Sequence, residues 1–317
     1  MNAIDDSSYQ GKLFNRTRTA VYTAQFDETT WARKDFKYKI DMVSLASKKG
    51  FLPIADKMFI NKAYNDTIIS AIANSKLRSR KTYMYSCLNF ILLKEALEKA
   101  ADKKLDKYVQ DNFFKRLGAY TTTYNPLEKF DKNDIVPTEK DDFLRRQLVQ
   151  GYVHDEGAAF MGGVSGNAGL FSNANDLAKL YQMWLNDGEY GGESYLSERT
   201  CKYFTKTKSS SSRRGLGFDK PETRTNKSSP CSFSTPASTY GHTGFTGTCF
   251  WIDPDNKLIY IFLTNRVYPK RTQKKLMSMN IRQRIQEEIY RAMKKTKTKE
   301  DITTTNTEED DEQTDTE

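Results

Sequence analysis

The sequence predicts an α+β fold, and the order of its segments carries that prediction. Residues 51–118 contain a short β-like run and then stretches in which apolar residues recur at helical spacing. The segment 248–264 places two β-rich runs around the turn residues 253–256, which favours a strand, a tight turn and a strand. Apolar residues recur at helical spacing again over 281–293. We therefore expect helices first, an antiparallel strand group next, and a terminal helix that covers the strands.

Four helices precede the strand group. Their apolar markers are Ile68, Ile69 and Ile72 in the first, Phe90, Leu93, Leu97 and Ala100 in the second, Val109, Phe113 and Leu117 in the third, and Leu177, Leu180, Tyr181 and Trp184 in the fourth. The second helix begins near Leu88, Gly118 ends the third, and Asn173 starts the fourth in an arrangement close to a capping box. Residues 119–171 read as loop-rich, and the run RRGLGFD predicts one short strand.

Composition and periodicity divide the chain into three segments. Residues 1–50 mix basic and aromatic residues without a clear period, so their structure is poorly defined by the sequence. Residues 51–295 carry the periodic patterns and form the predicted domain. Residues 296–317 are acidic and rich in threonine, have almost nothing to bury, and are expected to be disordered.

Charge is distributed unevenly. The net charge of +9 comes from 50 basic and 41 acidic residues, and nine of the acids lie in 300–317, which contain no base. Removing those nine leaves 32 acids against 50 bases, so the body carries +18. Such a body attracts anions. The bases are spread through the sequence rather than interleaved with aromatics, so a solvated surface is favoured over a nucleic-acid interface.

Several classes of protein are disfavoured. No run approaches the roughly 20 apolar residues of a membrane-spanning helix, and the first residues lack the apolar stretch of a signal peptide. The chain as written is therefore expected to be cytoplasmic. The four cysteines are scattered without a CxxC pair and neither histidine has a cysteine at ligand spacing, so neither a metal site nor a cofactor is expected.

The run GHTGFTGT at 241–248 is the most informative motif. It holds His242, one of only two histidines, among three glycines and three threonines. Glycines in a strand mark a close approach of another backbone or of a ligand. A structural histidine is the alternative when His242 is considered alone, and a ligand-facing strand is favoured in this context.

Four segments in order resemble the beta-lactamase-related serine hydrolases, a family that includes class C beta-lactamases, DD-peptidases and related esterases. These segments are YSCLN at 85–89, GGVSGNAGLFSNANDLAKL at 162–180, RRGLGFD at 213–219 and GHTGFTGT at 241–248. The resemblance implies a beta-lactamase/transpeptidase-like fold, an antiparallel sheet flanked by helices with a helical subdomain. It is closest to a branch often fused to glycoside hydrolase domains, whose members are often extracytoplasmic. It also implies a small-molecule or peptidoglycan-like substrate.

The resemblance also implies roles for individual residues. Tyr85 falls on the position of the tyrosine that shuttles a proton, and Cys87 falls where the family has Asn or Asp. His242, Thr243 and Gly244 fall on the strand that walls the pocket, and the Phe245 N–H is the candidate oxyanion donor. Three further residues fall on family positions outside these candidate site positions. His154 and Asp155 match a loop segment that usually reads His-Asp, and Asn167 stands where a histidine is common.

The family's nucleophile motif is absent from the sequence. No serine has a lysine three residues later, the Ser-x-x-Lys spacing that places both side chains on one helix face. We therefore expect an N-terminally truncated family member, inactive alone, in which Tyr85 stays neutral without a neighbouring lysine. Ser165 lacks the final glycine of a nucleophile elbow. Cys87 is a weak alternative nucleophile, whose thiol pKa the helix start would lower.

Two functions remain open. One is a serine hydrolase lineage that cleaves amide or ester bonds by acyl transfer; the other is a non-catalytic binder of cell-wall glycan, peptide or another polyanion. In the family the hairpin pairs within a sheet that N-terminal strands complete. Without them, an open sheet edge is expected to favour self-association.

Overall fold

Short strands and helices make up the chain in the computed structural model, which describes residues 3–27, 29–79, 83–224 and 226–311. The helices are α1 (Tyr64–Ala73), α2 (Leu88–Ala101), α3 (Leu105–Val109), α4 (Glu156–Phe160), α5 (Ala174–Leu185), α6 (Glu198–Thr205), α7 (Lys275–Ser278) and α8 (Ile281–Asp311). The strands are β1 (Ile4–Asp5), β2 (Phe14–Asn15), β3 (Tyr22–Gln25), β4 (Trp31–Arg33), β5 (Lys37–Tyr38), β6 (Val43–Ser44), β7 (Phe51–Ala55), β8 (Met58–Asn61), β9 (Thr123–Tyr124), β10 (Pro137–Asp141), β11 (Gln147–Gln150), β12 (Leu170–Phe171), β13 (Glu189–Tyr190), β14 (Glu193–Ser194), β15 (Tyr240–Thr243), β16 (Cys249–Asp253) and β17 (Leu258–Phe262).

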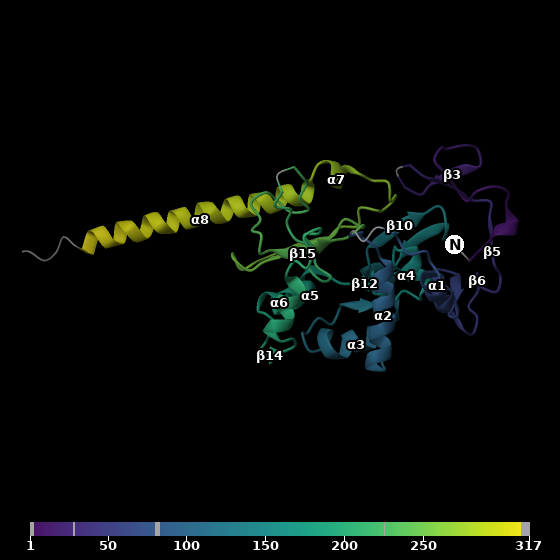
Figure 1. Cartoon of the computed structure of the whole chain (residues 1–317), viewed down its shortest axis with the longest axis horizontal. Coiled ribbons are helices and arrows are strands. Elements are labelled where there is room, and N and C mark those ends of the chain that lie inside the picture. Colours follow the sequence, from purple (N-terminus) through teal and green to yellow (C-terminus); the bar gives the residue numbers. More distant parts are fainter. Residues whose placement is uncertain (1–2, 28, 80–82, 225, 312–317) are drawn as a thin grey trace, which may run out of the picture.

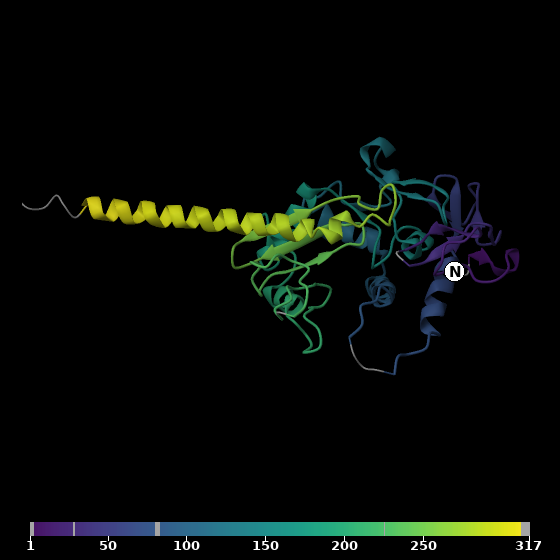
Figure 2. The same cartoon turned by 90° about the horizontal axis from the view of Figure 1, so that it is seen from above.

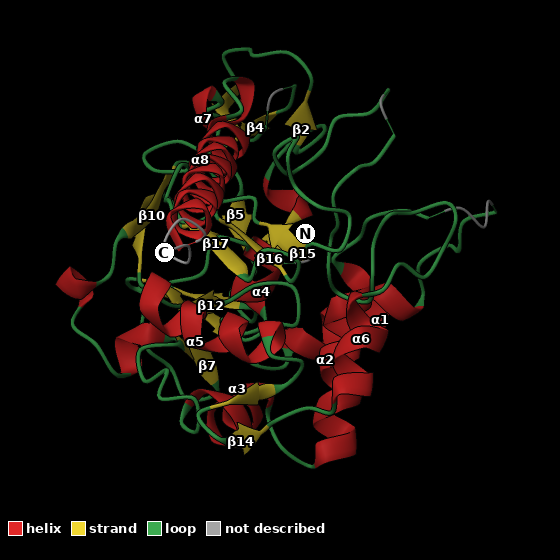
Figure 3. Cartoon of the chain, turned by 90° about the vertical axis from the view of Figure 1, so that its left-hand side faces the viewer, coloured by secondary structure: helices red, strands yellow, loops and turns green. Residues whose placement is uncertain are grey.

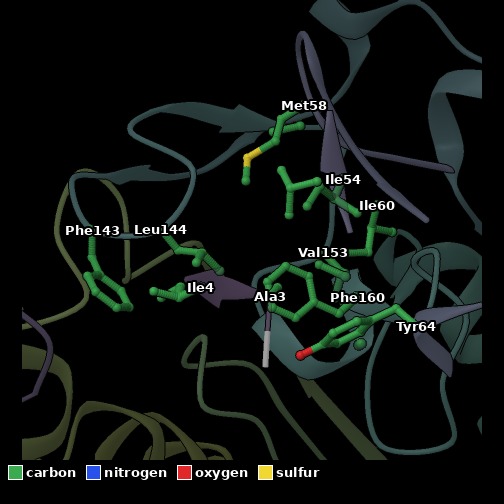
Figure 4. Close-up of a cluster of buried hydrophobic side chains, with 14 of the residues drawn as sticks. Ala3, Ile4, Ile54, Met58, Ile60, Tyr64, Phe143, Leu144, Val153 and Phe160 are labelled. Carbon is green, nitrogen blue, oxygen red and sulfur yellow. The ribbon is translucent and has the colours of Figure 1, made fainter. Parts of the chain in front are cut away.

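The N-terminal fifty residues contain six short strands, β1–β6, where the sequence suggested no element. They form small antiparallel sheets, β1 with β5 and β2-β4-β3, and β6 joins the β7–β8 hairpin. Figure 4 shows Ala3 and Ile4 lying in one apolar cluster with Ile54, Met58 and Phe160. The core therefore spans the predicted boundary between residues 50 and 51.

The predicted hairpin forms strands β16 and β17, and β15 pairs antiparallel with β16 on its other side. One face of this sheet meets α5, where Tyr181 stacks on Phe250 at 4.0 Å between ring centroids. The Tyr260 hydroxyl of β17 donates to the Arg282 carbonyl of α8 at 3.0 Å. Figure 3 shows α5 and α8 on either side of these strands. In the part of the chain that the structure describes, β17 ends the sheet with β16 as its one strand neighbour.

The run RRGLGFD does not form the predicted strand. Only Asp219 within it makes a β-bridge, with Gly241. Two hydrogen bonds hold that bridge, at 2.7 Å from Asp219 N–H and at 3.0 Å from Gly241 N–H. The run instead curves past the start of β15, because Gly217 adopts a φ of +81° that favours glycine.

Helix α8 projects from the body as one long rod (Figures 1 and 2). It runs from Ile281 through Asp311. The disorder expected for 296–311 stays a prediction. The prediction of disorder rested on the lack of apolar residues to bury. The predicted disorder of 312–317 falls outside the described residues.

Candidate functional site

Strand β15 presents His242 beside Thr243 at its end, before a tight turn back into β16. Gly241 is required here, because an added Cβ would lie 2.0 Å from the Phe250 carbonyl of the paired strand. Gly244 closes the turn, with its N–H donating to Thr248 O at 2.8 Å. The glycine at 241 thus serves a close approach of two backbones, while His242 remains half-buried at the surface.

The hydrogen bonds of His242 define its tautomer. Nε2 lies 2.8 Å from Nη1 of Arg214, and Nδ1 lies 2.7 Å from the carbonyl of Thr243. A guanidinium only donates, so Nε2 accepts and Nδ1 carries the proton. Burial lowers the pKa of His242, and the charge of Arg214 lowers it further against the Thr243 hydrogen bond. The imidazole is therefore neutral at pH 7, and its basic nitrogen is already occupied.

Tyr85 comes from the segment before α2 and meets His242 across the site. The two ring centroids lie 6.2 Å apart, and the Arg214 guanidinium lies 4.9 Å above the Tyr85 ring. Burial raises the pKa of Tyr85, with Cys87 adding to the effect and Arg214 opposing it. The phenol is therefore neutral at pH 7 and can donate a hydrogen bond but cannot serve as a ready base.

Cys87 is the exposed residue that precedes α2. Burial of its sulfur and the charge of Asp155 raise the pKa of the thiol, while a hydrogen bond with Asn167 opposes them. The hypothesis that the helix start lowers this pKa is wrong. The Asp155 carboxylate, which caps α4 by accepting from Ala158 N–H at 2.7 Å, opposes formation of a thiolate. Cys87 is therefore a poor nucleophile but a neighbour of Tyr85 and Asn167.

Phe245 occupies the turn after β15 with 61% of its surface exposed. Its ring stacks on His154 at 5.2 Å, and Arg266 fixes its carbonyl with hydrogen bonds of 3.0 and 2.6 Å. Among the described residues, no hydrogen-bond acceptor is found for the Phe245 N–H. The amide proposed as oxyanion donor is thus free to bind a ligand.

A buried charge cluster lies behind His154, and sequence reasoning missed it. Glu139 is 1% exposed and its Oε1 lies 2.8 Å from Arg145, 3.2 Å from Arg271 and 2.8 Å from His154 Nδ1. The strand β10 alternates here, with Glu139 and Asp141 pointing inward. In the sequence, the only indication of this cluster is that charged residues alternate along the strand with arginines nearby.

Sequence reasoning also missed Arg214 and Asp219, although it singled out the run that holds them. Arg214 Nη2 pairs with Asp219 Oδ2 at 2.8 Å. Backbone hydrogen bonds join Asp219 to Gly241, the residue before His242. The ion pair between Arg214 and Asp219 therefore holds the guanidinium against the imidazole. The structure thus brings Tyr85, Cys87, His242, Thr243, Gly244 and Phe245 to one region, with Arg214 between Tyr85 and His242.

Two cavities lie near this region rather than at it. One of about 300 Å³ is lined by Phe26, Trp31, Glu139 and Arg271, and so adjoins the cluster behind His154. Another of about 360 Å³ is apolar and lies between α5 and α6. Over the described ranges, no group of three or more His, Cys, Asp or Glu residues could hold a metal ion. No helix in those ranges is long and apolar enough to cross a bilayer.

Comparison with known proteins identifies the family. A protein of Escherichia coli (strain K12) named "Putative D-alanyl-D-alanine carboxypeptidase" is 34% identical over 281 residues, covering 81% of this chain and 64% of the relative. One of the same name from Salmonella gallinarum is 32% identical over 288 residues, covering 83% of this chain and 66% of the relative. The chain thus spans about two thirds of the length of these relatives.

The solved structure of an octameric penicillin-binding protein homologue from Pyrococcus abyssi is 18% identical, with a TM-score of 0.46, covering 74% of this chain and 49% of that one. The family model described as Beta-lactamase matches residues 40–282, which include every site residue above. The match of the family model shows that the chain belongs to the beta-lactamase-related serine hydrolase family.

Proposed function

We propose that this chain binds a peptidoglycan-like peptide at the Tyr85–His242 site and, by itself, does not hydrolyse it. The observation that carries this proposal is the contact between Arg214 and His242 Nε2 at 2.8 Å, which occupies the one basic nitrogen in the site. Within the described residues, no serine side chain hydrogen-bonds Tyr85 or His242. Acyl transfer by this family needs both a nucleophile and a base to activate it.

The site retains groups suited to binding. The Phe245 N–H is available to a carbonyl oxygen, and the exposed Tyr85 and Phe245 rings offer apolar contact to a peptide. The peptide class is proposed because the relatives carry the name of carboxypeptidases acting at D-alanyl-D-alanine. Fusion to a glycoside hydrolase domain stays a prediction of the sequence.

Reporter substrates test the absence of turnover. Purified chain incubated with nitrocefin and with p-nitrophenyl acetate is expected to give rates indistinguishable from those of Tyr85→Phe and His242→Ala variants. Oxyanion and binding groups alone can leave a small residual rate, which these variants would share. Saturable turnover that either substitution abolishes would overturn the proposal.

A further inference from the structure

The cavity of about 300 Å³ lies between the N-terminal strands and β10. Its size falls at the lower end of the ~300–1,000 Å³ that small-molecule sites occupy. One wall comes from β3 and β4, whose register sets Gln25 opposite Trp31, so both side chains lie on the same face of that sheet. The other wall comes from β10 and residues 270–272, and the Lys140 N–H joins them by donating to the adjoining Pro269 carbonyl at 3.0 Å.

Contacts within the chain hold these walls in place before any ligand binds. The Arg271 guanidinium lies 5.2 Å from the centre of the ring of Phe26, the residue that follows β3. It also donates to Glu139 of β10 at 3.2 Å and to Glu156 at 2.7 Å. The Phe26 ring packs edge-on against Phe143, at 5.6 Å between centroids. A site that is already ordered loses less entropy when a ligand binds.

The carboxylates that line the cavity are already paired with cations. Arg145 donates to Glu139 at 2.8 Å and to Asp141 at 2.9 Å. Asp142 lies 3.5 Å from the ammonium group of Lys34. These acids therefore leave the remaining cations of the lining without a counter-charge.

Three further cations line the cavity without a carboxylate partner. In the ranges that the structure describes, Arg18, Lys140 and Lys270 form no ion pair. Together with Arg145, Arg271 and Lys34, they make six cations against the four carboxylates named above. Two units of positive charge are therefore left over at the cavity.

The aromatic wall adds apolar surface and unused donors. Trp31 is half-buried, and the Arg18 guanidinium lies 5.4 Å from the centre of its ring, which holds that charge against the cavity. Among the described residues, no acceptor is found for the Trp31 indole N–H and no partner for the Gln25 amide. An aromatic surface beside a few convergent polar groups is typical of a small-molecule site.

We propose that this cavity binds a sugar phosphate, a phosphate monoester carried on a polar ring. The phosphate supplies close to two negative charges at pH 7 and three acceptor oxygens, which match the excess charge and the guanidinium of Arg18. The ring lies against Trp31, and its hydroxyls meet the indole N–H and the Gln25 amide. A neutral sugar leaves the cations unpaired, and inorganic phosphate leaves the aromatic wall in water. The inference goes beyond the proposed function, since it concerns a separate cavity.

Isothermal titration calorimetry at low salt tests this with four probes. The wild-type chain is expected to bind glucose 6-phosphate at least about tenfold more tightly than glucose, inorganic phosphate or glucuronate, a factor of the size of one charge-assisted hydrogen bond. Glucose lacks the charge, phosphate lacks the ring, and glucuronate carries one negative charge in place of two. Arg18→Gln is expected to weaken the binding of glucose 6-phosphate at least about tenfold. Trp31→Leu is expected to reduce its affinity to that of inorganic phosphate.

Lys208→Gln is the matched control. Lys208 is also an exposed cation over an aromatic ring, 3.3 Å from the centre of that of Tyr203, and it lies outside the cavity. Its substitution removes one positive charge and is expected to leave the affinity for glucose 6-phosphate unchanged. Thermal melting shows whether each variant is folded. If Trp31→Leu does not fold, the exposed Arg18 decides through Arg18→Gln.

Three results would count against the sugar phosphate. Glucose 6-phosphate bound no more tightly than inorganic phosphate or glucuronate overturns the class of ligand. An affinity unchanged in Arg18→Gln, or lowered equally in Lys208→Gln, overturns the location of the site. No binding of glucose 6-phosphate by the wild-type chain overturns the proposal as a whole. Peptide binding at the Tyr85–His242 site is untouched by each of these results.

Discussion

At the scale of single residues, Arg145 and the carboxylates beside it form a buried, hydrogen-bonded charge cluster. The Arg145 side chain is fully buried and donates to Asp141 at 2.9 Å and to Glu139 at 2.8 Å. The Asp141 carboxylate also accepts backbone N–H groups from Phe143, Leu144 and Arg145. Burial alone would raise the pKa of Asp141, but Arg145 and these N–H groups bring it below its usual value. The cluster thereby supports His154, and through it Phe245.

Removing Arg145 is therefore expected to be costly. Arg145→Met leaves the buried Asp141 carboxylate without its main partner, removes one of three partners of Glu139, and should lower the free energy of unfolding by about 3–5 kcal/mol. Arg291→Met, at an exposed arginine paired with the exposed Glu288, should cost less than about 1 kcal/mol. Urea denaturation of both variants measures the difference. Similar losses in the two would contradict the assigned role of the cluster.

The same groups give a pH dependence with a definite sign. The folded pKa values of Asp141 and Glu139 are lowered, so the unfolded chain binds protons more readily. The stability they add is present above the unfolded pKa of about 4 and is lost as pH falls through the folded values. Melting temperature is expected to fall between pH 6 and pH 3. In Arg145→Met the decrease should be smaller, and an equal decrease would contradict this account.

At the scale of elements, periodicity located α1, α2, α5 and α8, missed the shorter helices α4, α6 and α7, and misjudged the buried faces of α2 and α8. Helix α2 begins at Leu88 as predicted, but its buried residues are Ile91, Lys94 and Glu98. Leu93, a predicted marker, is 58% exposed. The reason is that Glu98 accepts from the first N–H of α3, at Leu105, at 2.9 Å, and Lys94 pairs with Glu98 at 3.4 Å. Apolar spacing cannot reveal a face buried for its polar contacts.

Helix α8 shows the same pattern. Over residues 281–296, where side chains are described, the buried residues are Arg282, Gln286 and Tyr290, one position beyond the predicted isoleucines. Gln286 accepts from Ser232 N–H at 3.0 Å, and the Tyr290 hydroxyl donates to Asp253 at 2.6 Å. These partners lie more than 35 residues away in the chain, so no local pattern predicts them.

Substitutions on the two faces of α2 are expected to change the free energy of unfolding by different amounts. Ile91→Ala removes a side chain that is 5% exposed and should lower the free energy of unfolding by about 2–4 kcal/mol. Leu93→Ala on the exposed face should change it by less than about 0.5 kcal/mol. Urea denaturation of the pair distinguishes the faces. A larger loss for Leu93→Ala would show that the apolar face of α2 is the packed one.

At the scale of the whole molecule, the sequence was most informative where family motifs meet in space. Tyr85 and His242 are 157 positions apart in the chain and their rings lie 6.2 Å apart, as the resemblance implied. Arg214 could not be predicted, because its placement depends on the bridge between Asp219 and Gly241. The short N-terminal strands have two to four residues each, too few to show a period. Self-association through an open sheet edge stays a prediction.

We propose that this beta-lactamase-family site lacks a group able to form an acyl-enzyme. Intact-mass spectrometry after prolonged incubation of the native chain with benzylpenicillin tests this proposal. The mass is expected to stay unchanged from that of the untreated chain. A stoichiometric gain equal to the mass of the penicillin, mapped by peptide digestion to a serine or to Cys87, would contradict it.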